Sequence, residues 1–180
     1  LEGISTRAFG WTGINVIDKR MKGSQRGCVS VISGLRGAAK STILSQIILN
    51  CVQNGATSIC YSGELSSQRF MKWMYMQAAG KAYTKPYELY EGYFCPNEIK
   101  PRIAEWMGDF MWLYNNHYGN NFQKIGECLR TEILTRKADL CIVDNLMALD
   151  LSTFDMDKYE AQTRFVWELK DIAQNCDVHI

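Results

Sequence analysis

The chain has 180 residues, of which 47% are hydrophobic and 22% charged, and its formal net charge is +1. This length and composition indicate one globular domain with a buried core, and the near-zero charge excludes an overall basic surface for nucleic acid. The apolar runs are too short to cross a bilayer and no secretory signal begins the chain, so we expect a cytoplasmic protein with no membrane partner. The first residue is not Met, which leads us to expect a piece of a longer protein.

Seven cysteines are spread along the chain and form no CxxC pair. Several lie within apolar runs, so we expect small buried side chains in a reducing compartment. The two histidines, His117 and His179, are isolated in the sequence. This spacing argues against a zinc site and favours structural roles for both rings.

Helical and extended patterns alternate along the chain. Residues 1–27 form a lead-in segment, and residues 28–180 form the domain proper. The pattern predicts strands over 28–33, 57–61, 109–114 and 140–143, with another beginning at 177. It predicts helices over 14–21, 41–54, 66–79, 97–107, 122–136 and 159–175. Strands that alternate with helices indicate an α/β fold, a parallel sheet with helices on both faces.

The turn after the first expected strand reads GLRGAAKS over residues 34–41. It fits the pattern Gly-x-x-x-x-Gly-Lys-Ser except at Ala39, where the pattern has glycine. Backbone N–H groups of such a turn point at phosphate oxygens, while Lys40 would reach the terminal phosphates and Ser41 would bind Mg²⁺. If position 39 needs a positive φ, alanine is strained there by about 1 kcal/mol. The alternative is an ordinary strand, turn and helix with an incidental lysine.

Two carboxylates follow the ends of other expected strands. Glu64 could accept a proton from a water molecule that attacks a γ-phosphate, although a surface residue capping the next helix fits the spacing equally well. Asp144 closes the run LCIVD and could hold Mg²⁺ through its water shell, the weaker alternative being an ordinary Asp at a strand end. Asn145 could orient water or sense phosphate, or it could simply form a turn. Parallel strands end at one edge of a sheet, so we expect these side chains to meet the turn there.

With these residues in place, the chain resembles the RecA-like ATPase domain of DnaB/Twinkle-type hexameric replicative helicases, especially phage and prophage members. The stretches that carry the resemblance are ISTRAFGWTGINVIDKRMKG, VISGLRGAAKSTILSQIILN, ICYSGELSSQRFMKWMYMQAAG, MWLYNNHYGN, ADLCIVDNLMALDL and YEAQTRFVWELKDIAQNCDVHI. They cover most of the chain, in the family's order. YSGEL and VDNLM are more specific than the phosphate-binding turn.

The resemblance implies a RecA-like P-loop NTPase fold, truncated at its C-terminus, with ATP and Mg²⁺ as cofactors. It implies Glu64 as catalytic base beside Lys40, and Ser41 and Asp144 as metal ligands. It also implies single-stranded DNA passing the loop after Asp144, a homo-oligomeric and typically hexameric parent, and a primase-like region or loader as further partners. The nucleotide-binding set then comprises Gly34, Arg36, Gly37, Ala38, Ala39, Lys40, Ser41, Thr42 and Asn145.

The chain departs from the family at Ala39, and it ends before the segment that carries the family's phosphate sensor, second DNA loop and arginine finger. We therefore expect the nucleotide site but little unwinding by these 180 residues alone. A recombinase or circadian-clock-type ATPase is an alternative within the same fold. An assembly module whose turn no longer binds nucleotide is an alternative from another class.

Overall fold

The computed structural model describes residues 12–21, 23–115, 121–146 and 157–180. Its strands are β1 (Ser58–Ser62), β2 (Lys85–Pro86), β3 (Tyr93–Phe94), β4 (Met111–Asn115) and β5 (Leu140–Asp144). Its helices are α1 (Asn15–Met21), α2 (Lys40–Gln53), α3 (Ser67–Tyr83), α4 (Lys100–Gly108), α5 (Phe122–Arg136) and α6 (Lys158–Asn175). The predicted α/β class is confirmed, and so is each expected helix to within a few residues.

Three parallel strands form the main sheet, in the order β4, β1, β5. In its register, Ser62 at the end of β1 pairs with Asp144 at the end of β5 and with Asn115 at the end of β4. All three strands therefore finish together at one edge. This is the arrangement in which α/β sheets bind ligands.

The sheet continues beyond β5 through shorter backbone contacts. Leu140 forms a parallel bridge with His179, and Ile180 in turn donates to Cys28 O at 3.0 Å and accepts from Ser30 N at 2.7 Å. The segment around Val29 therefore runs beside residues 178–180, which run beside β5. Strand-like pairing reaches residues 28–30 in this way.

The expectation of a buried core strand over 28–33 is wrong. No strand is assigned there, and the side chains of Val31 and Ile32 are 75% and 40% exposed. Only Val29 packs against the core. Among the described residues this segment pairs only with residues 178–180, at the margin of the sheet, and Val31 and Ile32 lie beyond that pairing and are exposed.

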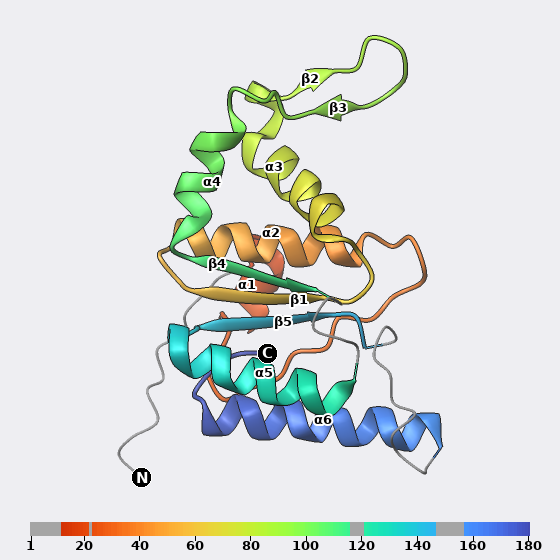
Figure 1. Cartoon of the computed structure of the whole chain (residues 1–180), viewed down its shortest axis with the longest axis vertical. Coiled ribbons are helices and arrows are strands. Elements are labelled where there is room, and N and C mark those ends of the chain that lie inside the picture. Colours follow the sequence, from red (N-terminus) through yellow and green to blue (C-terminus); the bar gives the residue numbers. More distant parts are fainter. Residues whose placement is uncertain (1–11, 22, 116–120, 147–156) are drawn as a thin grey trace.

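Each face of the sheet is covered by helices, as Figure 1 shows, with α2, α3 and α4 on one side and α5 and α6 on the other. Side chains of β1 alternate between these faces. Ile59 and Tyr61 join the α5/α6 core, whereas Cys60 joins the α2/α3/α4 core. Burial on both faces explains why β1 reads as a continuous apolar run rather than as an alternating one.

The expected stop of the third helix at Gly80 is confirmed as a break in the helix, although α3 resumes beyond it. Gly80, with φ 59° and ψ −173°, lies outside helical geometry and kinks α3, and the helical residues after it end at Tyr83. The Tyr-rich stretch that follows forms a short antiparallel hairpin, β2 and β3, which projects beyond α3 in Figure 1. None of the helices within the described ranges has the length and apolar character needed to span a bilayer.

Candidate functional site

The candidate site lies where the parallel strands end. In Figure 1 the orange turn that precedes α2 lies at the same end of the molecule as the arrowheads of β1 and β5. Ser41, Glu64 and Lys40 all lie close enough to Asp144 to affect its pKa. Residues from the turn, from the end of β1 and from the end of β5 therefore share one site.

Ala39 has φ 57° and ψ 27°, in the left-handed region. The condition under which alanine is strained at this position, a positive φ, is therefore met. A left-handed alanine brings its Cβ close to the following carbonyl, at a cost of about 1–2 kcal/mol. Glycine would adopt the same geometry without that cost, as Gly37 does in the same turn with φ 80°.

Lys40 holds the turn in its present shape. Its Nζ donates to Gly34 O and to Leu35 O, each at 3.0 Å. The ammonium group therefore lies against the turn that would cradle a phosphate, although these contacts are exposed to solvent. Because the ammonium group sits on a flexible stem, it can exchange these two neutral carbonyl oxygens for the charged oxygens of an anion.

The start of α2 presents backbone N–H groups with little competition from side chains. Its N-cap, Ala39, provides no side-chain hydrogen bond, and the first turn carries no acidic residue. In contrast, α3, α5 and α6 are capped by the side chains of Ser66, Asn121 and Asp157. An uncapped helix start carries partial positive charge, which favours an anion.

Asp144 is 3% exposed, and its Oδ2 has no hydrogen-bond partner among the described residues. Burial raises the pKa of Asp144, the hydrogen bond with Ser41 lowers it, the charge of Glu64 raises it and the charge of Lys40 lowers it, and the net shift is upward. A buried carboxylate oxygen without a partner is costly. A cation at this point would remove that cost.

Glu64 is exposed, and its Oε2 accepts a hydrogen bond of 2.5 Å from Asn145 Nδ2. The main chains beneath are also joined, because Gly63 N donates to Asp144 O at 2.7 Å. The alternative role of Glu64, capping the next helix, belongs instead to Ser66, whose side chain accepts from Arg69 N. Glu64 is therefore held in place while its carboxylate stays accessible to water.

The donor set fits a hydrated Mg²⁺ better than a metal held wholly by protein. No group of three or more His, Cys, Asp or Glu side chains gathers around a potential metal position in the described part of the chain. A nucleotide-bound Mg²⁺ needs only one or two protein oxygens, the rest coming from phosphates and water. Ser41 and Asp144, with its unpaired oxygen, could supply them.

The sequence predictions for the site fare unequally. Lys40, Ser41, Glu64, Asp144 and Asn145 are brought together. The other turn residues of the predicted set are exposed, and this applies to Gly34, Arg36, Gly37, Ala38, Ala39 and Thr42. Most of the loop after Asp144, expected at a DNA channel, lies outside the described residues, and so does His117.

Sequence reasoning missed the contact between Asn145 and Glu64. It depends on the register that pairs Ser62 with Asp144, which no local pattern specifies. The adjacency of acidic and amide side chains at two strand ends was the available signal.

Comparisons with known proteins assign no role to these residues. No known family model matches the sequence, and no curated protein matches it.

Proposed function

We propose that this chain is an ATP-binding and ATP-hydrolysing domain, whose site is formed by the turn before α2 and the ends of β1 and β5. The observation that carries the proposal is the buried, unpartnered Asp144 Oδ2, which lies next to Ser41 below an uncapped helix start. A purely structural strand end would pair this oxygen or leave it in water. Such a site instead fits a ligand that brings a cation and an anion together, as Mg·ATP does.

Each residue has a definite part in this proposal. Lys40 would exchange its contacts with Gly34 O and Leu35 O for phosphate oxygens. Glu64 would take the proton from the attacking water, and Asn145 would fix the direction of its carboxylate. Mg²⁺, held by Ser41 and Asp144, would neutralise charge on the phosphates.

The wider role that we propose is the motor domain of a hexameric replicative DNA helicase acting on single-stranded DNA. It is supported by the sequence resemblance and is compatible with the parallel order of β5, residues 178–180 and residues 28–30. Stimulation of ATP hydrolysis by single-stranded DNA in the full-length protein would support a motor. Strand displacement would then favour the helicase, whereas strand exchange would favour the recombinase alternative.

A nucleotide-independent assembly module is the second candidate, and specific observations favour it. Ala39 is in the left-handed region, and Lys40 is bonded to its own turn. Both features would oppose phosphate binding if the turn were rigid.

Calorimetry with a non-hydrolysable ATP analogue and Mg²⁺ decides between the two candidates. We expect the chain to bind the analogue with 1:1 stoichiometry, and Lys40→Ala to weaken binding by at least about tenfold, because a charge-assisted contact is lost. Lys81→Ala, an exposed lysine near the end of α3, is the matched control and should bind as the parent does. Absence of binding by the chain and by Ala39→Gly would favour the assembly module.

A further inference from the structure

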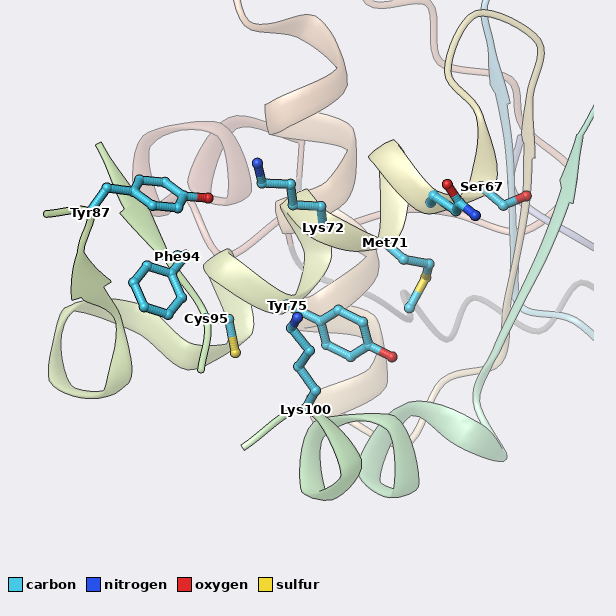
Figure 2. Close-up of a pocket in the computed structure, with 9 residues that line it drawn as sticks. Ser67, Met71, Lys72, Tyr75, Tyr87, Phe94, Cys95 and Lys100 are labelled. Atoms are coloured by element: carbon cyan, nitrogen blue, oxygen red, sulfur yellow. The ribbon is translucent and has the colours of Figure 1, made fainter. Parts of the chain in front are cut away.

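A cavity of about 570 Å³ lies along α3, between this helix, the start of α4 and the hairpin of β2 and β3 (Figure 2). Its walls are mainly apolar. Met71 and Tyr75 come from α3, and Tyr87 and Phe94 come from the hairpin. This volume falls within the usual range for small-molecule sites.

The aromatic walls are held by contacts among themselves. Tyr87 lies 5.0 Å from Phe94 between ring centroids, and it also stacks on Tyr90 at 4.3 Å. The backbone also fixes this side of the cavity, because Tyr87 N donates to Gly92 O at 3.0 Å. Flat rings already held in place favour a flat ligand, since little side-chain freedom is lost on binding.

Two lysines give the cavity its charge. Lys72 Nζ lies 5.7 Å from the centroid of Tyr87, and Lys100 reaches in from the start of α4 (Figure 2). Lys100 Nζ is bonded only to a neutral oxygen in the contacts that the structure describes, Asn97 Oδ1 at 2.7 Å. Among the described residues that line the cavity, none is acidic. The apolar space therefore has a positive rim.

We propose that this cavity binds a small planar aromatic molecule that carries one negatively charged group. The ring system would pack among Met71, Tyr75, Tyr87 and Phe94, and the anionic group would lie near Lys72 and Lys100. The cavity shares no lining residue with the candidate nucleotide site.

The surroundings argue against a polyanion such as single-stranded nucleic acid. Glu88 and Glu91 are exposed on the same hairpin, and Lys85 is paired with Glu98 at 3.3 Å. A long phosphate backbone leaving the cavity would meet these carboxylates. A single charge confined to the cavity would not.

The test uses two fluorescent probes with related ring systems, 8-anilinonaphthalene-1-sulfonate and the uncharged N-phenyl-1-naphthylamine. We expect both to bind once per chain, the sulfonate more tightly. Lys72→Gln with Lys100→Gln should weaken sulfonate binding by roughly tenfold and leave the neutral probe nearly unchanged, since only the ionic contacts are removed. Tyr87→Ala should weaken both probes by roughly tenfold.

The controls separate the cavity from general apolar surface. Lys81→Gln removes a lysine from α3 outside the cavity and should leave both affinities unchanged. Circular dichroism of every variant checks that the fold is kept. Binding of several probes per chain, or affinities unaffected by the cavity variants, would overturn the proposal. So would displacement of the sulfonate by a single-stranded oligonucleotide or an acidic aromatic peptide that binds far more tightly through the same residues.

Discussion

The two halves of the candidate nucleotide site differ in how firmly the fold holds them. The carboxylate half, Asp144 and Glu64, stands at the ends of neighbouring strands, with Asp144 buried and Glu64 bonded to Asn145. The turn half, residues 34–39, is exposed and lies between a segment at the margin of the sheet and the start of α2. The turn is held partly by Lys40, whose Nζ donates hydrogen bonds to Gly34 O and Leu35 O.

This difference has a physical origin. The strands β1 and β5 are buried on both faces and paired along their length, so their ends have one position. The segment that leads into the turn has a partner on one side only, around Ile180. If the site binds nucleotide as we propose, the fold would set the two carboxylates in advance and leave the turn to adjust when the ligand arrives.

The largest expected effect tests the carboxylate half. Glu64→Gln should lower ATP turnover in the full-length protein by roughly 10²–10⁴-fold while nucleotide affinity is kept, because the amide cannot accept the proton. Phosphate release and calorimetry measure the two quantities. Glu105→Gln, on the exposed surface of α4, is the control. Unchanged turnover would remove Glu64 from the catalytic role.

Asp144→Asn separates function from stability in the same half. Burial and the charge of Glu64 raise the pKa of Asp144, so removing its charge should stabilise the fold at neutral pH by about 1 kcal/mol. The same change should weaken the Mg²⁺-dependent part of nucleotide binding by about tenfold. Urea unfolding and calorimetry with and without Mg²⁺ test these opposite signs. Asp109→Asn, at an exposed position at the end of α4, should change neither the free energy of unfolding nor the Mg²⁺-dependent binding.

Ala39→Gly tests the turn half. Relief of the left-handed alanine should raise the free energy of unfolding by about 1 kcal/mol, measured by urea denaturation. Ala38→Gly is the matched control, since Ala38 has no positive φ and glycine there only adds freedom to the unfolded chain. Equal effects of both substitutions would contradict the strain at position 39.

The smallest effect concerns the segment that carries the turn. His179 is buried between Gln25 O at 2.7 Å and Ser30 Oγ at 3.1 Å. Burial lowers its pKa, although the contact with Gln25 O raises it in part. Above the ordinary histidine pKa of about 6.5, the ring is neutral in both states and contributes no pH dependence.

Below that pH the unfolded chain binds the proton more readily than the folded chain. The free energy of unfolding should therefore decrease as the pH is lowered, until the folded ring is protonated too. His179→Gln should flatten this part of the curve of unfolding free energy against pH. An unchanged slope would show that another group is responsible.

The sequence predicted helices and the central strands well because their signals are local. The apolar face of α2 and the run that ends at Asp144 each contain their own period. The burial of residues 28–33 could not be predicted in the same way, because it depends on what lies beside the segment. Val31 and Ile32 look like core residues in sequence and are exposed at a margin.

The sequence indicated which residues form the candidate site, but not which of their side chains contact one another. The pattern of the turn singled out position 39, where alanine stands in place of glycine, and the meeting of strand ends follows from the parallel sheet. In contrast, the bond of Asn145 with Glu64 depends on tertiary register, and the cavity depends on how the Tyr-rich stretch folds back on α3. The catalytic and binding roles remain predictions.

The backbone pairing of residues 28–30 with residues 178–180 has a consequence for the order of folding. Gln25 and His179, which contact one another beside this pairing, are 154 residues apart in sequence. Closing so long a loop is slow relative to local helix formation, and during synthesis it must wait for residue 180 to leave the ribosome. The turn before α2 is translated well before residues 178–180, so in a nascent chain the segment that leads into the turn gains this pairing only after those residues have emerged.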